Sequence, residues 1–305
     1  KGFTPPPTTC PNDLDKNVQK MFDMLEKSKR PLVVAGYGVR QGNVVNKFKE
    51  FLSILNVPVI LSRGGIDLLP FSHPNNMGLA GIKGSRYCRK LMQSADLIIS
   101  LGSRLAIPFI GSDSDYFSKN ASSVVVDIEY AELVKPGIRV DLAINADVGV
   151  VIDAMVNCLL GDTKRFNFES WLSYCQKLKR SYPMVTDDIK RDPIDLYYFM
   201  SRLDSISGSR DVLVTDAGSN YYVGGQVFTF EHGQRELTST TFAAMGLTVP
   251  LAIGAAVARK DAQILAVTGD GSLELNIQEL KTISYYRLNI KLFIINNGGY
   301  VSMRN

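Results

Sequence analysis

The chain has 305 residues, of which 45% are hydrophobic and 21% are charged, and its formal net charge is +4. This length allows two domains, each with its own core, and the composition is ordinary for a soluble globular protein. The small net charge and the lack of a dense Lys/Arg run do not indicate nucleic-acid binding. No apolar segment reaches the length of a membrane span, and the start of the chain has no signal-peptide pattern.

The cysteines indicate the compartment of the protein, and the ends of the chain indicate how its domains continue. The four cysteines are Cys10, Cys88, Cys158 and Cys175. They lie far apart, without the spacing of a metal site, and we therefore expect free thiols in a cytoplasmic protein. The Pro-rich start indicates that residues 1–17 are a linker from an upstream domain. No helical pattern follows the last strand, so we expect the second domain to be incomplete at its C-terminal end.

Residues 18–160 alternate between helical and extended patterns. Amphipathic spacing predicts helices at 17–28, 44–52 and 148–160. Apolar runs predict buried strands at 30–36, 57–61, 95–102, 123–129 and 141–144. Alternation of this kind predicts one middle α/β domain with a doubly wound, mainly parallel sheet.

Loops that follow these strands form a candidate nucleotide site. Gly36 and Gly38 after the first strand are typical of a phosphate-binding loop, although the third glycine of the dinucleotide fingerprint is missing. Asp127 could hold a ribose or could simply close a strand-end turn. Arg40 and Arg104 could meet a pyrophosphate or could be solvated. The residues alone leave these interpretations open.

A polar, charged stretch separates the middle domain from the next one. It covers residues 161–192, contains Pro183 and predicts a connecting helix and a linker. The second domain therefore comprises residues 193–305. Its alternating patterns again predict a doubly wound α/β fold with a mainly parallel sheet.

The first strand of the second domain runs into a polar loop with Gly218, Ser219 and Asn220. The glycine permits a tight turn, and the two polar side chains can donate hydrogen bonds to an anion. The same residues would also cap an ordinary helix. The loop is therefore a candidate anion site with a structural alternative.

Apolar runs at 264–267 and 291–295 flank a helical pattern, which predicts a strand, a helix and a second strand parallel to the first. The carboxyl ends of parallel strands meet at one edge, where open α/β sheets bind ligands. Asp270 and Asn297 follow these two strands. Their side-chain oxygens, together with nearby loop carbonyls, form an all-oxygen set that suits Mg²⁺.

The loop around Asp270 also has the features of a phosphate site. Gly269 and Gly271 let backbone amides approach a phosphate at the start of a helix, and Ser272 can add a hydroxyl. The alternative is an ordinary βαβ unit with Asp270 in a turn, because short motifs recur by chance.

The Gly-Asp-Gly loop, the helix and the Asn-Asn pair that ends the next strand together resemble the fingerprint of the thiamine diphosphate (ThDP)-dependent enzymes. The resemblance implies that the Asp270 carboxylate, the Asn297 side chain and the Gly299 carbonyl hold the metal. It also implies that residues 218–220 contact the diphosphate. Acetolactate synthases usually have Gly-Gln-His in that loop, whereas this chain has Gly-Ser-Asn.

A run of small residues at 252–258 follows a Met-Gly pair. Small side chains allow helices to pack closely, which explains the run without any cofactor. The resemblance adds that Met245 is a wedge beneath the cofactor that bends its two rings toward each other. It further implies that the backbone of Ala243 and Met245 binds the edge of the aminopyrimidine ring.

The resemblance covers the whole chain and is to the large subunit of acetolactate synthases, with a middle domain and an incomplete diphosphate-binding domain. It implies ThDP and Mg²⁺ as cofactors. FAD is a further candidate, because the middle domain of acetolactate synthases binds it. In this family the activating glutamate belongs to the upstream domain, so no catalytic residue is expected in this chain. The family's active site forms between subunits, which implies a homodimer or homotetramer.

The activity that the resemblance implies is decarboxylation of a 2-keto acid, pyruvate foremost, followed by carboligation to a second carbonyl compound. Another ThDP-dependent decarboxylase or lyase, or a carboligase of sugar metabolism, is an alternative within the family. A catalytically silent nucleotide-binding relative is the alternative from another class.

Overall fold

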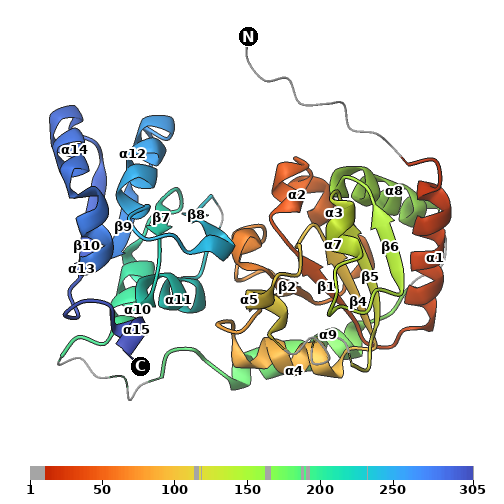
Figure 1. The fold of residues 1–305 in the computed structure, drawn as a ribbon. Coiled ribbons are helices and arrows are strands. Elements are labelled where there is room, and N and C mark those ends of the chain that lie inside the picture. The colour runs from red at the N-terminus through yellow and green to blue at the C-terminus, as the bar shows by residue number, and fades with distance from the viewer. Residues whose placement is uncertain are drawn as a thin grey trace, which may run out of the picture. The chain divides into compact units, whose positions relative to one another are not determined.

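The computed structural model describes residues 11–112, 117, 119–161, 166–186, 189, 193–231 and 233–304 (Figure 1). The chain divides into two compact units. Unit 1 runs to Leu68 and continues over Pro74–Tyr182, and unit 2 comprises Leu69–His73 and the chain from Pro183. Cys10 and most of the expected 1–17 linker lie outside the described residues. No helix in the described ranges is long and apolar enough to cross a membrane.

The sheet of unit 1 has six parallel strands in the order β3-β2-β1-β4-β5-β6. The strands are β1 (Pro31–Ala35), β2 (Val59–Leu61), β3 (Asn76–Leu79), β4 (Leu97–Leu101), β5 (Ser122–Asp127) and β6 (Leu142–Asn145). Every residue of the central strands β1 and β4 is buried, which explains their uninterrupted apolar runs. The order reverses between β1 and β4, where a doubly wound sheet has its switch point.

Helices cover both faces of this sheet (Figure 1). On one face α8 packs against α1 and α3, and on the other α4 packs against α9. Because side chains alternate along a strand, Leu32 and Val34 of β1 share the core beneath α4 and α9. The helices of unit 1 are α1 (Leu14–Lys27), α2 (Gly38–Gln41), α3 (Val45–Leu55), α4 (Arg86–Ser94), α5 (Ile107–Ile110), α7 (Tyr130–Leu133), α8 (Val148–Gly161) and α9 (Glu169–Ser181), with a 3₁₀ turn, η1 (Arg63–Gly65).

Helix α9 belongs to the core of unit 1, whereas the sequence suggested a connecting segment over 161–192. Trp171, Leu172 and Cys175 are buried against the same core as β1. The Trp171 indole N–H donates to the Pro31 carbonyl at 2.8 Å. The polar face of α9 dominates its composition, and the short apolar face that anchors it to the sheet is easily overlooked.

Unit 2 has a sheet of four parallel strands in the order β10-β9-β7-β8. The strands are β7 (Val212–Thr215), β8 (Arg235–Leu237), β9 (Ile264–Gly269) and β10 (Ile290–Ile295). Small residues of α12, Ala252 and Ala255, pack on one face, and α10 and α11 lie near the other, where Phe199 meets Phe293. The helices are α10 (Leu196–Ile206), α11 (Ser219–Val227), α12 (Thr248–Ala258), α13 (Asp270–Leu273), α14 (Leu280–Tyr286) and α15 (Val301–Arg304), with 3₁₀ segments η2 (Thr240–Phe242) and η3 (Glu274–Glu279).

These two parallel sheets confirm the α/β prediction for both halves of the chain. The sequence analysis did not find β3 or β8. Both are short edge strands that contain polar or glycine residues, so neither has the apolar run of a central strand.

Candidate functional site

The carboxyl ends of β9 and β10 bring predicted metal ligands together in unit 2. The strands pair in parallel with Gly269 opposite Ile295, so Asp270 and the asparagine pair leave the sheet at one edge. Gly298 and Gly299 have φ values of 77° and 104°, which favour glycine and turn the chain back. The Gly299 N–H donates to Asp270 Oδ2 at 2.8 Å.

The third predicted ligand, Asn297, lies in the exposed loop after β10. Its side chain makes no hydrogen bond with any residue that the structure describes. The Gly299 carbonyl accepts the Val301 N–H at 2.8 Å and keeps a second lone pair. A carboxylate, a free amide oxygen and a backbone carbonyl fit the oxygen preference of Mg²⁺. The described part of the chain holds no cluster of three His, Cys, Asp or Glu side chains for a metal.

The predicted phosphate loop is open at one glycine and covered at the other. A Cβ on Gly269 would meet no atom within 4 Å, so space lies over that residue. A Cβ on Gly271 would meet Tyr300 Cε1 at 2.4 Å, because the tyrosine ring lies directly on the glycine. The Gly271 N–H donates to Asp270 Oδ1 at 2.9 Å.

Ser272 is buried, and its hydroxyl lies among internal groups of unit 2. The hydroxyl donates to Asp216 Oδ2 at 2.6 Å and accepts the Gly246 N–H at 2.7 Å. The predicted contact between this hydroxyl and a phosphate stays a prediction, and both of the hydroxyl's contacts in the structure are to the protein.

The loop after β7 places its polar side chains in two different ways. Gly218 has φ 71° and ψ −147°, a conformation that only glycine adopts readily, just before α11. Ser219 is partly exposed. Asn220 is buried, and its amide donates to the Val267 carbonyl at 2.7 Å. Ser219 is therefore accessible to an anion, whereas the Asn220 amide group ties this loop to β9.

The loop before α12 holds Ala243 and Met245 in a constrained turn. Ala243 and Thr240 have φ values of 43° and 52°, which are uncommon for residues with a Cβ. The Tyr221 hydroxyl donates to the Thr240 carbonyl at 2.7 Å and fixes this part of the loop. Met245 is 39% exposed, so a large apolar side chain is presented on a loop with little freedom.

Two residues that the sequence analysis missed connect these loops. Asp216 is fully buried, and its carboxylate accepts hydrogen bonds from Asn220 and Ser272. Asn276 donates to the Gly246 carbonyl at 2.7 Å. One sequence feature could have pointed to Asp216: it is a charged residue directly after an apolar strand. A carboxylate that is buried at such a position needs several hydrogen-bond donors around it.

In unit 1, the two glycines after β1 pack against the loop after β4. A Cβ on Gly36 would meet the Gly102 carbonyl oxygen and Ser103 Cα at 2.2 Å, and one on Gly38 would meet Gly102 Cα at 2.8 Å. The Gly38 N–H also donates to the Gly102 carbonyl at 2.9 Å. These glycines therefore permit close packing of two loops at the switch point of the sheet.

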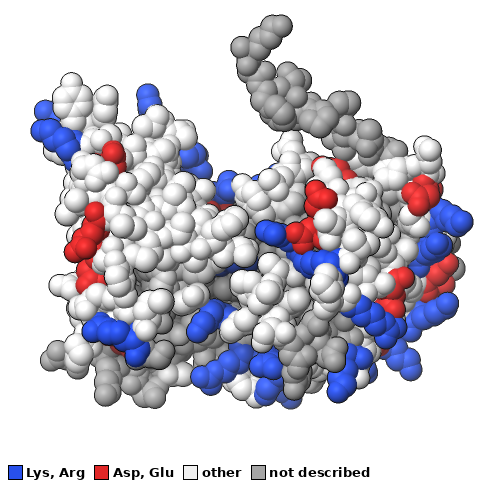
Figure 2. Space-filling model, viewed as in Figure 1, with Lys and Arg blue, Asp and Glu red and all other residues white. Residues whose placement is uncertain are grey.

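The arginines of the candidate nucleotide site pair with acidic residues. Arg40 lies 2.8 Å from Asp67, and Arg104 lies 2.7 Å from Glu132. Lys135 pairs with the other oxygen of Glu132 at 2.8 Å and donates to the Arg104 carbonyl. Acidic and basic side chains accordingly lie side by side in the region of α7 (Figure 2). These three cations are engaged with partners inside unit 1.

Asp127 closes a strand-end turn, since its Oδ1 accepts the Glu129 N–H at 3.0 Å. Burial raises the pKa of Asp127 above its ordinary value, although the hydrogen bond from Glu129 opposes the shift. Burial also raises the pKa of Glu132, but Lys135 and Arg104 outweigh it, so that the pKa of Glu132 lies below its ordinary value. The turn is the structural alternative that the sequence left open for Asp127.

Two family models match the chain. "Thiamine pyrophosphate enzyme, central domain" matches residues 18–155, and "Thiamine pyrophosphate enzyme, C-terminal TPP binding domain" matches residues 216–305. The chain belongs to the thiamine pyrophosphate enzymes. Thiamine pyrophosphate is the same compound as ThDP, so the family that the motifs indicated is confirmed. The boundaries of the two matches fall within unit 1 and unit 2.

Relatives of this thiamine pyrophosphate enzyme are named as large subunits of acetolactate synthase. One from Cyanidium caldarium is 31% identical over 288 residues, which are 92% of this chain and 48% of the relative. One from Lactococcus lactis is 28% identical, with 93% and 48% covered. Isozyme 1 of Escherichia coli is 30% identical, with 93% and 49% covered. The chain thus spans about half the length of these relatives.

The residues suggested for FAD in this thiamine pyrophosphate enzyme do not fit the pyrophosphate of that cofactor. The loops with Gly36 and Gly102 are in backbone contact, so no space remains between these two glycines. Arg40 and Arg104 already have carboxylate partners. A pyrophosphate at these positions would have to compete with both ion pairs.

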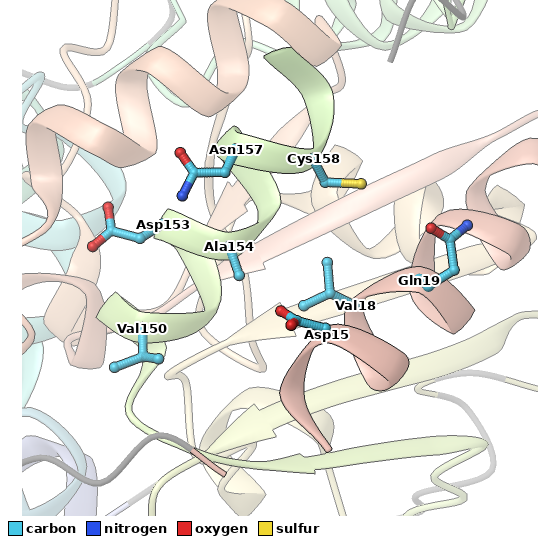
Figure 3. Close-up of a pocket in the computed structure, with 8 residues that line it drawn as sticks. All are labelled: Asp15, Val18, Gln19, Val150, Asp153, Ala154, Asn157 and Cys158. Atoms are coloured by element: carbon cyan, nitrogen blue, oxygen red, sulfur yellow. The ribbon is translucent and has the colours of Figure 1, made fainter. Parts of the chain in front are cut away.

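A separate hollow of about 460 Å³ lies between α1 and α8 of unit 1 (Figure 3). The carboxylates of Asp15 and Asp153 line it from the two helices, together with Cys158. None of the residues suggested for ThDP, the metal or FAD lines this hollow, and it forms no part of the candidate site.

Proposed function

We propose that this chain binds ThDP through Mg²⁺ and takes part in decarboxylation of a 2-keto acid with carboligation to a second carbonyl compound. The names of the relatives suggest acetolactate synthesis, for which pyruvate is the proposed 2-keto acid. The observation that carries the proposal is the Asp270–Gly299 contact, because it joins two predicted ligands across the ends of β9 and β10.

In this proposal the metal is held by Asp270, Asn297 and the carbonyl of Gly299. Asn297 supports it with a side chain that no described residue engages. The metal would bridge the protein to the diphosphate, since two negative groups need a cation between them. Gly269 contributes to the phosphate site because open space lies over it.

The remaining contacts to the diphosphate come from the start of α11 and α13. Gly218 and the Ser219 hydroxyl approach from the loop after β7, and the backbone N–H of Ser272 approaches from the loop after β9, where Gly271 donates its own N–H to Asp270. Asn220 acts by tying the first loop to β9. The alternative of an ordinary turn is disfavoured because these loops follow the adjacent strands β7 and β9.

The ring end of the cofactor would lie on the loop before α12. Met245 would support the rings with its exposed side chain, and the backbone of Ala243 and Met245 would bind the aminopyrimidine edge. The constrained turn keeps these groups in place without the cofactor, which lowers the entropic cost of binding. When bound, ThDP supplies the carbanion-stabilising chemistry that a side chain cannot.

The proposal places the activating glutamate on another domain and the active site between subunits of a homodimer or homotetramer. A cytoplasmic location is supported by the free thiols of Cys88, Cys158 and Cys175. FAD is left out of the proposal, because the residues suggested for it are engaged elsewhere.

The activity is tested by supplying the full-length protein, including the domain that carries the activating glutamate, with ThDP and Mg²⁺ and measuring CO₂ release from a panel of 2-keto acids. Release from pyruvate, with acetolactate as product, is expected. Release from another 2-keto acid alone would indicate a related decarboxylase or lyase. No release from any of them would contradict a decarboxylating function.

The metal site is tested by replacing Asp270 with Ala and measuring ThDP binding calorimetrically in the presence of Mg²⁺. Binding should be lost, because the diphosphate loses its bridge to the protein. Glu274→Ala is the matched control, since that carboxylate is exposed and lies just beyond the same loop. Unchanged affinity in Asp270→Ala would remove the metal assignment.

A further inference from the structure

Asp216 lies where the loops after β7 and β9 meet. Its carboxylate is fully buried. Oδ1 accepts the Ala217 N–H at 2.7 Å and the Asn220 amide at 3.1 Å. Oδ2 accepts the Ser272 hydroxyl at 2.6 Å and the Thr268 hydroxyl at 3.3 Å. One side chain thus holds two loops that the proposed function assigns to the diphosphate.

The same carboxylate also faces α12. The N–H of Thr248, the first residue of that helix, lies 3.4 Å from Oδ2. No ion pair of the described residues involves Asp216, so hydrogen-bond donors and the helix terminus stabilise its buried carboxylate. Because both oxygens of the Asp216 side chain accept hydrogen bonds, this side chain suits the ring of donors better than an amide would.

Ser272 extends the connection to the loop that carries Met245. Its hydroxyl donates to Asp216 and accepts the N–H of Gly246, the residue directly after Met245. The Gly246 carbonyl in turn accepts the Asn276 amide at 2.7 Å. Both ends of this residue are therefore held by the chain that follows β9.

The local backbone geometry requires a glycine at position 246 and brings the Asn276 side chain to it. Gly246 has φ 79°, and a Cβ there would meet Leu275 Cβ at 2.8 Å. Asn276 departs from helical geometry, with φ −140° and ψ 31°, within η3. This kink occurs at the residue whose side chain reaches Gly246. A non-helical residue inside a helical segment indicates a position where a contact outweighs regular hydrogen bonding.

We propose that Asp216 is a positioning residue for the cofactor: through the Ser272 hydroxyl it fixes Gly246, and therefore Met245, relative to the diphosphate loops. This inference rests on the proposed ThDP function. It assigns the Ser272 hydroxyl to an internal link and leaves the Ser272 backbone N–H for a phosphate. The ring end and the diphosphate end of the cofactor are then placed by one connected set of hydrogen bonds.

The test compares two ligands in the full chain with Mg²⁺ present, by calorimetry: ThDP, which has the rings, and inorganic pyrophosphate, which lacks them. Ser272→Ala removes the link and keeps the backbone N–H. We expect it to weaken ThDP binding about three- to tenfold and to change pyrophosphate binding less than about twofold. Asn276→Ala, which releases the other end of Gly246 from a less buried position, should show the same pattern.

The matched control is Ser239→Ala. The Ser239 hydroxyl oxygen accepts the Ala244 N–H at 2.8 Å, so it supports the same loop without any link to Asp216. Both affinities should stay within about twofold in this variant. Far-UV circular dichroism confirms that each variant is folded.

The outcomes separate the two proposals. An equal loss for both ligands, or no loss for either, in folded Ser272→Ala and Asn276→Ala would overturn the positioning role. The first result would instead indicate a direct phosphate contact or a general loss of structure. Failure of the wild-type chain to bind either ligand would overturn the proposed function, and this inference with it.

Discussion

The ring of Tyr300 lies on Gly271, so that a Cβ on the glycine would meet Tyr300 Cε1 at 2.4 Å and Cζ at 3.1 Å. Tyr300 follows the turn at Gly299 that returns the chain to Asp270. The aromatic contact and this hydrogen bond therefore join the same two loops, the ones after β9 and β10. A glycine at position 271 therefore leaves room for the tyrosine ring, in addition to any role in phosphate binding.

The first prediction is a coupling between Gly271 and Tyr300. Gly271→Ala should lower the free energy of unfolding of unit 2 by about 1 kcal/mol, because the added methyl displaces a tyrosine ring that is exposed and can move aside. In a Tyr300→Ala background the same substitution should cost less than half as much. Differential scanning calorimetry of the four proteins in this cycle measures the coupling. Equal costs in both backgrounds would show that the ring does not constrain the glycine.

The second prediction concerns the packing of the loops in unit 1. Gly36→Ala should destabilise unit 1 by about 3 kcal/mol, because the new Cβ meets backbone atoms that cannot rotate away. Urea unfolding followed by the fluorescence of Trp171, the one tryptophan of the chain, reports on this unit. Gly161→Ala at the end of α8 is the control, since a Cβ there would meet no atom within 4 Å. A similar small effect in both variants would contradict the packing role.

Parallel topology explains why so much of the candidate site followed from the sequence. The apolar run of β9 has the length and continuity of a buried strand, the run of β10 is equally long although this strand lies at the edge of the sheet, and a helix between them requires a parallel pair. Asp270 and Gly299 must then leave the sheet at one edge, and the structure places them in hydrogen-bond contact. The sequence motif therefore predicted both the kind of ligands and the edge of the sheet at which they lie.

Contacts between loops that are distant in sequence could not be found in this way. Asp216 has partners at Thr268 and Ser272, and nothing in the spacing of these residues predicts that their side chains meet. The same limit explains why the tyrosine over Gly271 was overlooked. Helix α9 was placed outside the domain because its polar residues outnumber the few apolar residues that hold it to the sheet.

The third prediction is that the protein carries no flavin. After incubation with excess FAD and gel filtration, it should show no flavin absorbance, because the suggested glycines and arginines are engaged in contacts within unit 1. The unfolding midpoint followed by Trp171 fluorescence should likewise not shift with FAD, since a ligand stabilises only a state that it binds. Flavin retained in a fixed ratio to protein would contradict this reading of the loops.

The fourth prediction concerns the pH dependence of unit 1 and compares Asp127 with Glu132. Burial raises the pKa of Asp127, so the unfolded chain loses its proton at a lower pH than the folded protein does. The stability that this group contributes is present below its ordinary pKa of 3.8 and is lost as pH rises through the folded pKa. Asp127→Asn cannot ionise and keeps an oxygen for the Glu129 N–H. Its stability relative to wild type should therefore increase between about pH 4 and neutrality.

Glu132→Gln is the matched comparison, and its sign is opposite. Burial raises the pKa of Glu132, but Lys135 and Arg104 lower it further, so its stabilising contribution is present above its ordinary pKa of 4.5 and is lost as pH falls. The glutamine variant should thus become less stable than wild type as pH rises over the same range. Urea midpoints from Trp171 fluorescence give both differences. Parallel trends in the two variants would contradict the opposite pKa shifts.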